Sequence, residues 1–208
     1  MTTSESPAWS GVNHLALVTS DMDSTVRFYH GVLGMPLVAN LAAGSMRHYF
    51  FRCGPQSTIA FFQWDGADIA SFEKPAGMPF NFPAQFDHLS LTLPDEAALV
   101  ALQQRLIDHD VQVTPIVDHG FVRSVYFHDN NGIALEASWW VLDPTVGEVS
   151  YDGSELISDP APVEAVRELA ATGELAWLPA SRLASAHWIA PTPAVGAPVF
   201  DARPRVRR

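Results

Sequence analysis

VNHLALVTSDMD (residues 12–23) returns in the second half of the chain as FDHLSLTLPDEA (residues 86–97). Aligning the two segments places His14 on His88, an offset of 88 − 14 = 74 residues. In both copies apolar and polar residues alternate, and an acidic residue then precedes an amphipathic stretch. This is the pattern of a short strand followed by a capped helix. The chain therefore contains an internal repeat that begins with a strand and a helix.

The repeat extends through three more strands. The offset of 74 residues, continued without a gap, places Phe62 on Glu136. The strand candidates after each helix are residues 36–41, 47–53 and 57–64, and then residues 111–117, 121–128 and 132–140. Each unit is thus predicted to be a βαβββ module, with Ser20 or Asp21 as the N-cap of the first helix. The predicted fold class is α+β, with two tandem modules that form a cupped mixed sheet.

The repeat also sets the expected organisation of the chain. The linker between the modules is rich in Gly, Pro and Phe, and after Asp143 the repeat pattern ends. One further helix is expected near residues 161–172. The expected segments are a tail at 1–9, a first module at 10–66, a linker at 67–83, a second module at 84–143 and a C-terminal extension at 144–208.

Composition excludes several classes of protein. The chain has 208 residues, 48% of them hydrophobic, and a formal net charge of −11. This acidic balance argues against a nucleic-acid partner, and the apolar runs are too short to span a membrane. The first residues lack the pattern of a secretory signal, and the single cysteine, Cys53, suits a reducing compartment. We therefore expect a cytoplasmic protein that binds neither nucleic acid nor membrane.

Strand periodicity places three polar residues, His14, His88 and Glu136, mid-strand on faces of small side chains. Large aliphatic residues occupy the opposite faces. A buried carboxylate is costly unless it is paired, and a divalent cation would neutralise it and use the lone pairs of both imidazoles. The three residues therefore form a predicted metal site, around which the two modules would fold.

The number of ligands indicates the type of metal. Two His and one carboxylate form the facial triad that is typical of non-haem Fe(II) oxygenases. Phe62 occupies the repeat position of Glu136, so no fourth protein ligand is expected there. Zn(II) can also be held by two His and one Glu with a water. Fe(II) is the expected metal, with Mn(II) or Zn(II) as alternatives.

With these residues in place, the chain resembles the vicinal oxygen chelate superfamily, which includes glyoxalase I, bleomycin-resistance proteins and type I extradiol ring-cleaving dioxygenases. The resemblance covers residues 10–142. Within it, residues 117–136 are similar to the extradiol dioxygenase signature. The matching residues are His119, Val125, Tyr126, Asp129, Gly132 and Glu136, and Asn130 stands where that family has Pro.

The resemblance implies roles for further residues. His119 and Tyr126 would hydrogen-bond the substrate hydroxyl oxygens near the metal and take part in catalysis. Phe62, His48 and His128 are candidate substrate-binding residues. Aromatic residues that could line an apolar pocket, or else pack in the core as aromatics at such positions more often do, are Phe61, Phe62, Trp64, Phe80 and Phe82.

One feature of extradiol dioxygenases is missing from the sequence. They usually have an acid–base histidine shortly before the second metal histidine, and no histidine occurs here between Tyr49 and Asp87. Proton transfer would need another group, and His48 and His119 are the available choices.

The resemblance thus implies an Fe(II)-dependent extradiol-type dioxygenase that cleaves a catechol or a related vicinal-diol aromatic. Its partners would be a small aromatic substrate and dioxygen, and the chain is expected to form a homo-oligomer. One alternative is another metal-dependent enzyme of the superfamily, such as an isomerase, a lyase or a hydrolase. A second alternative is a non-catalytic binding protein like the bleomycin-resistance members.

Overall fold

The computed structural model describes residues 10–67, 69–70, 72–79, 86–147, 150–151 and 156–179. The chain divides into two compact units, residues 1–147 and residues 148–208. The first unit contains both repeats, and the second contains the expected helix, α3 (Glu164–Thr172). The expected N-terminal tail and residues 180–208 of the expected extension lie outside the described residues.

The first repeat forms a βαβββ module. Its elements are β1 (His14–Val18), α1 (Met22–Val26), the π-helix η1 (Arg27–Val32), β2 (Leu37–Ala43), β3 (Met46–Arg52) and β4 (Thr58–Trp64). The strand order is β1-β4-β3-β2, in which β1 is parallel to β4 and the other pairs are antiparallel. Of the two N-cap candidates, Asp21 caps α1, because its side chain accepts a hydrogen bond from the Ser24 backbone N–H.

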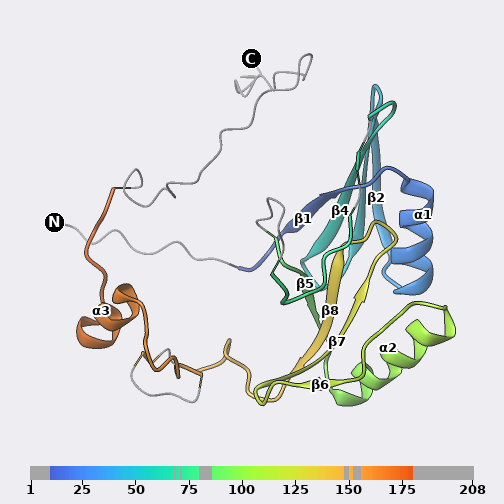
Figure 1. Ribbon diagram of the computed structural model, residues 1–208. Helices are drawn as coiled ribbons and strands as arrows, with labels where there is room; N and C mark the ends of the chain where they lie inside the picture. The colour runs from blue at the N-terminus through green and yellow to red at the C-terminus, as the bar shows by residue number, and fades with distance from the viewer. Residues whose placement is uncertain are drawn as a thin grey trace. The chain divides into compact units, whose positions relative to one another are not determined.

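The second repeat forms the same module. Its elements are β5 (Leu89–Thr92), α2 (Glu96–Asp108), β6 (Val117–Asp118), β7 (Val122–His128) and β8 (Ala134–Trp140). The order β5-β8-β7-β6, with β5 parallel to β8, repeats the order of the first sheet. The predicted fold class is therefore confirmed as two four-stranded mixed sheets, each covered on one face by its own helix (Figure 1).

One hydrophobic core joins the modules. Residues of both repeats contribute fully buried side chains to it, namely Tyr29, Phe51, Phe61, Leu99, Leu106 and Leu135. These residues come from the helices and from the aliphatic strand faces, as the alternation of the strands predicts. The buried Tyr29 hydroxyl also donates a 3.0 Å hydrogen bond to Asp129, between β7 and β8. The opposite faces of both sheets, which carry the candidate site residues, take no part in this core.

Two expected strands differ from the structure. His88 lies just before β5 rather than mid-strand, because Asp87 turns towards the linker and accepts hydrogen bonds from Lys74 and Gly77. The strand expected at residues 111–117 is reduced to the two-residue β6 and an isolated bridge. Pro115 lies in this segment and has no N–H to donate to a neighbouring strand.

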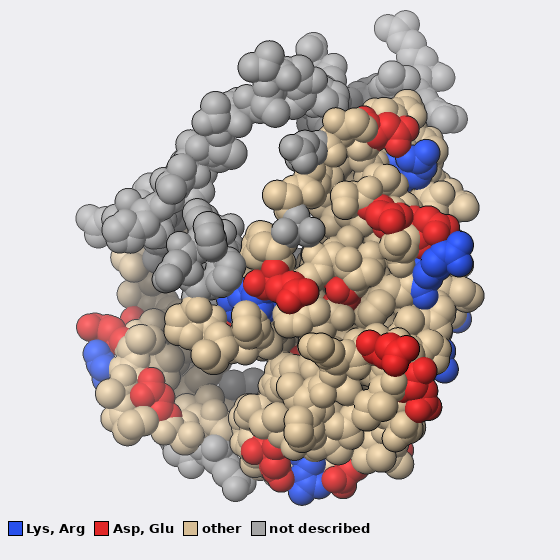
Figure 2. Space-filling view, turned by 45° about the vertical axis from the view of Figure 1, so that its right-hand side comes forward, with Lys and Arg blue, Asp and Glu red and all other residues tan. Residues whose placement is uncertain are grey.

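Charged side chains are interspersed on the surface. Figure 2 shows blue Lys and Arg groups beside red Asp and Glu groups. Salt bridges on the surface include Arg27–Asp23 at 2.6 Å and Arg123–Glu96 at 2.7 Å. Within the described residues, no helix has the length and apolar character needed to cross a membrane.

Candidate metal centre and active site

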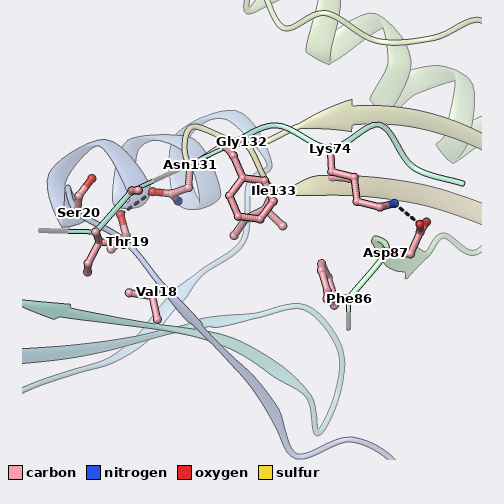
Figure 3. Close-up of a pocket in the computed structure, with 13 residues that line it drawn as sticks. Val18, Thr19, Ser20, Lys74, Phe86, Asp87, Asn131, Gly132 and Ile133 are labelled. Carbon is pink, nitrogen blue, oxygen red and sulfur yellow. Dashed lines mark hydrogen bonds and ion pairs between the residues drawn. The ribbon is translucent and has the colours of Figure 1, made fainter. Parts of the chain in front are cut away.

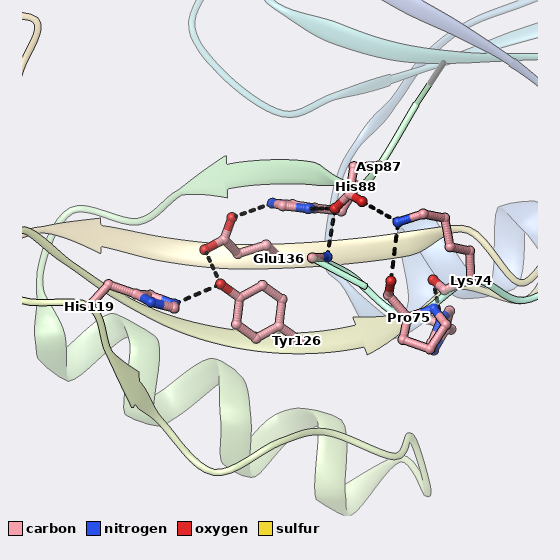
Figure 4. Close-up of polar contacts among 9 residues, drawn as sticks. Lys74, Pro75, Asp87, His88, His119, Tyr126 and Glu136 are labelled. Atoms are coloured by element: carbon pink, nitrogen blue, oxygen red, sulfur yellow. Dashed lines mark hydrogen bonds and ion pairs between the residues drawn. The ribbon is translucent and has the colours of Figure 1, made fainter. Parts of the chain in front are cut away.

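Glu136 lies at the centre of a polar cluster on the second sheet. Glu136 is on β8, paired with Ser90 of β5 on one side and with Tyr126 of β7 on the other. The three side chains therefore lie on the same face of the sheet. The Tyr126 hydroxyl lies 3.0 Å from Glu136 Oε1, and His88 Nε2 lies 3.0 Å from Glu136 Oε2 (Figure 4). The Glu136 residue is only 6% exposed. One largely buried carboxylate therefore holds a phenol with one oxygen and an imidazole with the other.

The cluster keeps Glu136 ionised. Burial opposes its ionisation, but the neighbouring hydroxyl groups of Ser124, Ser90 and Tyr126, together with His88, hold the pKa of Glu136 below its usual value. Burial, followed by the contact with Glu136, raises the pKa of Tyr126. Around neutral pH, Glu136 is therefore an acceptor and Tyr126 is a neutral phenol that donates to it.

His119 completes this polar series. Its Nε2 atom lies 2.9 Å from the Tyr126 hydroxyl oxygen. Because the single phenol proton is donated to Glu136, His119 Nε2–H must be the donor to the Tyr126 oxygen. The turn that carries His119 is fixed by Asp118, which accepts hydrogen bonds from the Gly120 N–H at 2.8 Å and from Arg123 at 3.1 Å. The two residues expected to act in catalysis are therefore in contact.

The other side of His88 contacts the linker. Its Nδ1 atom lies 2.6 Å from Asp87 Oδ2, and Asp87 also accepts hydrogen bonds from the Lys74 ammonium and from the Gly77 N–H. These donors, Lys74 first, hold the pKa of Asp87 far below its usual range. Lys74 is 8% exposed, and its carbonyl oxygen accepts a 3.1 Å hydrogen bond from His128 Nε2. Candidate substrate residue His128 is therefore tied to the linker through this nitrogen.

Sequence reasoning did not find Lys74 and Asp87. Thirteen residues separate the two (87 − 74 = 13), across a linker without periodicity that could predict their contact. Two signals in the sequence could have pointed to them. Lys74 is the only lysine of the chain, and it lies in an otherwise mostly apolar linker. Asp87 directly precedes His88, a predicted metal ligand.

The first sheet carries a separate cluster of aromatic residues. The His48 ring stacks on Phe62 at 3.6 Å between centroids, and Phe62 stacks on Trp64 at 5.3 Å. His14, exposed at the start of β1, lies 6.4 Å from the His48 ring. Burial and then His14 lower the pKa of His48. The His48 Nε2 atom is buried without a hydrogen-bond partner among the described residues. Substrate candidates Phe62 and His48 thus lie together, beside His14.

The other aromatic candidates for an apolar pocket do not all lie on this face of the sheet. Trp64 is partly exposed on this face, but Phe61 is fully buried in the core. Phe61 therefore belongs to the core, because adjacent residues on β4 point to opposite faces of the sheet. Phe80 and Phe82 lie outside the described residues.

The structure brings together two of the three predicted metal ligands. Across the part of the chain that the structure describes, no group of three or more His, Cys, Asp or Glu side chains could hold a metal ion. His88 and Glu136 are adjacent, whereas His14 contacts Asn13 and His48 of the first module. The site of three residues stays a prediction.

The adjacent pair fits a divalent cation. Two cis ligands at the usual distances of about 2.1 Å from an octahedral ion lie about 3 Å apart. His88 Nε2 and Glu136 Oε2 are 3.0 Å apart. Without a metal, one proton joins these two atoms, and a cation can take its place. Imidazole and carboxylate are also suitable ligands for Fe(II), Mn(II) and Zn(II).

An apolar cavity of about 360 Å³ is lined in part by Asp87, the residue that precedes His88. The Lys74–Asp87 pair lies at one end, and a 2.6 Å hydrogen bond between Thr19 and Asn131 lies at the other (Figure 3). Its walls are mainly apolar side chains, among them Val18, Phe72, Phe86 and Ile133. The cavity has room for a small organic ring.

Fold and sequence together define the class of protein. A family model described as the Glyoxalase/Bleomycin resistance protein/Dioxygenase superfamily matches residues 11–137, which is more than half of the chain. The chain therefore belongs to this superfamily, as the sequence predicted. Members of the superfamily include many metalloenzymes and typically bind a divalent metal. A comparison with curated proteins gave no match.

Solved structures share the fold. A glyoxylase/bleomycin resistance protein/dioxygenase domain from Frankia sp. EAN1pec is 25% identical, with a TM-score of 0.55 over 64% of this chain and 99% of that one. TnmS3, an antibiotic binding protein from Streptomyces sp. CB03234, is 18% identical, with a TM-score of 0.50 over 65% of this chain and 99% of that one. At this identity, the second likeness shows the fold alone.

Proposed function

We propose that the chain is an Fe(II)-dependent extradiol-type dioxygenase that opens the ring of a catechol or a related vicinal-diol aromatic. The observation that carries this proposal is the series His119–Tyr126–Glu136–His88 on one sheet face. The metal would be held by His14, His88 and Glu136. Fe(II), when bound, supplies the redox link between an aromatic diol and dioxygen.

The protein side chains would bind the substrate and move its protons. Glu136 offsets part of the metal charge, because hydrogen bonding keeps it ionised. Tyr126 and His119 lie next to this carboxylate and can donate to, or accept from, a diol oxygen there. Of the two candidates for the missing acid–base histidine, His119 contacts the Tyr126 hydroxyl, whereas His48 stacks on Phe62. This geometry favours His119 for proton transfer.

We propose further that a second copy of the chain supplies His14 to complete the metal site. His14 is exposed, and the described residues of one chain do not bring three ligands together. The face around His14 also exposes apolar side chains that contact with a second copy would bury, namely Val12, Val18, Leu41 and Trp64. Cyclic dimers are the commonest soluble oligomers, and the same surface would then be used twice.

A panel of catechols and dioxygen tests the reaction. The protein reconstituted with Fe(II) without air should bind about one ion per chain. It should then consume O₂ and form a yellow ring-opened product with at least one diol. Glu136→Gln should abolish both, whereas His109→Ala, on an exposed helix end, should change neither. Tight binding of Mn(II) or Zn(II) without O₂ uptake on any diol would contradict the dioxygenase. It would favour an isomerase, lyase or hydrolase.

Mixing two inactive variants tests the second copy. His14→Ala and Glu136→Gln each damage a different half of the proposed site. After exchange of subunits, a mixture should regain about a quarter of the parent metal sites, because only mixed dimers hold one intact set. A site within one chain predicts no recovery in the mixture.

A binding function without catalysis is supported by a different observation. The stack of His48, Phe62 and Trp64 offers a flat aromatic surface that needs no metal. A protein of this kind would bind planar aromatic compounds and quench Trp64 fluorescence equally with and without metal. His14→Ala would then behave like the parent.

A further inference from the structure

In both modules, the residue before the predicted metal histidine contacts its Nδ1 atom. His14 Nδ1 lies 2.7 Å from Asn13 Oδ1, and His88 Nδ1 lies 2.6 Å from Asp87 Oδ2 (Figure 4 shows the second pair). Asn13 and Asp87 are related by the offset of the repeat, since 87 − 13 = 74. The same contact therefore occurs at equivalent positions of the two modules.

This contact determines which ring nitrogen can bind a metal. The side-chain oxygens of Asn13 and of ionised Asp87 are acceptors, so the proton in each contact belongs to the imidazole Nδ1 atom. A neutral imidazole with a proton on Nδ1 has its lone pair on Nε2. In the second module, Nε2 shares a proton with Glu136 in the metal-free chain, and a cation that displaces this proton would meet the lone pair.

We propose that Asn13 and Asp87 are positioning residues, which hold His14 and His88 in the Nδ1–H form so that both Nε2 atoms can bind the metal. This inference rests on the metal site of the proposed function. Hydrogen-bond acceptors behind metal-binding histidines generally fix the ring and make the other nitrogen a better ligand.

Asn13 and Asp87 do not hold their histidines equally strongly. Asn13 is neutral and exposed, whereas the Asp87 carboxylate is held by the ammonium of largely buried Lys74 and, at 2.7 Å, by the Gly77 N–H. The Asp87 carboxylate is therefore held in place by the linker on one side while it binds His88 on the other. A charged acceptor also makes the stronger hydrogen bond. We therefore expect Asp87 to contribute more to metal binding than Asn13.

Nitrogen NMR of the metal-free, full-length chain tests the tautomers. The spectra are taken about two units above the usual imidazole pKa of about 6.5, and a His88→Gln variant assigns the His88 signals. In the metal-free parent, Nδ1 of His88 should carry a proton, in addition to the one that Nε2 shares with Glu136. In Asp87→Ala, the Nδ1 proton should be lost and the Nε2 proton kept. Asp87→Asn, which reproduces the pair of the first module, should keep the Nδ1 proton.

Titration with Zn(II) tests the consequence for metal binding. Asp87→Ala should weaken zinc binding by about 10- to 100-fold, the usual effect of losing such a partner. Asp87→Asn and Asn13→Ala should each weaken zinc binding less than Asp87→Ala does. If Asp87→Ala does not fold, two other results test the positioning role. These are the zinc affinity of Asp87→Asn and the loss of the Nδ1 proton of His14 in Asn13→Ala.

The inference is overturned if His88 keeps its Nδ1 proton in Asp87→Ala, or if that variant binds zinc as tightly as the parent. A parent that binds no zinc and no Fe(II) would instead refute the metal site of the proposed function. The tautomer spectra would then still decide the role of Asp87, so the two failures can be told apart.

Discussion

The Tyr126 hydroxyl donates a 3.0 Å hydrogen bond to Glu136 from the directly opposite position on the neighbouring strand. Both residues therefore reach the same point above the second sheet, and His119 joins them from the turn between β6 and β7. The pair combines an ionised carboxylate with a neutral phenol whose proton can move to or from a bound ligand.

Tyr126→Phe should separate catalysis from metal binding. The variant keeps the ring but loses the hydroxyl, so turnover with a catechol should fall by about 10²- to 10⁴-fold. Metal content should stay near that of the parent, because the phenol is not a ligand in the proposed site. The measurement is kcat against bound iron, with Tyr151→Phe in the second unit as the control. Unchanged turnover would remove Tyr126 from the mechanism.

Gly132→Ala should destabilise the fold more than Gly120→Ala. Both glycines have positive φ, +80° and +84°, so both alanine variants are strained by about 1–3 kcal/mol. Only at Gly132 would the new Cβ also meet a backbone oxygen, that of Phe72 at 2.8 Å. Urea unfolding of both variants measures the difference. Equal losses of unfolding free energy would show that the Phe72 backbone oxygen adds no steric penalty at Gly132.

Acid should weaken the turn that carries His119. Hydrogen bonds from the Gly120 N–H and from Arg123 hold the pKa of Asp118 below its usual value. A lowered carboxyl pKa contributes stability above the unfolded value of about 3.9, and this contribution is lost as the pH falls through the folded pKa. The urea midpoint of the parent should therefore exceed that of Asp118→Asn at pH values above about 4, and this difference should shrink as the pH falls below about 4. A gap that does not change with pH would contradict the assignment.

Lys74 should react slowly with amine reagents in the folded protein. Its ammonium is largely buried and donates to Asp87 and to the Pro75 carbonyl oxygen. Because it is the only lysine, peptide mass analysis after acetylation reports on this one side chain. The native rate should be far below the rate in urea, and Asp87→Ala should raise it. Equal rates in folded and unfolded protein would contradict the contact.

Periodicity predicted most of the fold but not the contacts across the linker. The repeat located both modules, and strand alternation separated the core face from the face of Glu136. Strand alternation also placed His88 within a strand, whereas β5 begins at Leu89. The alternation does not show that Asp87 turns away to contact Lys74. A resemblance selected His119 and Tyr126 as catalytic residues, but their contact with each other was not predicted, since they are seven positions apart (126 − 119 = 7) with a turn between them.

The position of His14 shows a different limit. The repeat relates it to His88, and both modules do present their histidine beside an acceptor at the preceding residue. A repeat states which positions are equivalent, but not whether equivalent positions of one chain meet in space. For that reason the sequence predicted one cluster of three ligands, whereas the described residues of one chain bring together two of them.

Metal binding by single variants tests the central claim most directly. Equilibrium dialysis without air should give about one Fe(II) per chain for the parent. If His14, His88 and Glu136 hold the metal, then His14→Ala, His88→Ala and Glu136→Gln should each lose this ion, while His109→Ala keeps it. A His14→Ala protein that binds Fe(II) with the stoichiometry and affinity of the parent would contradict this assignment.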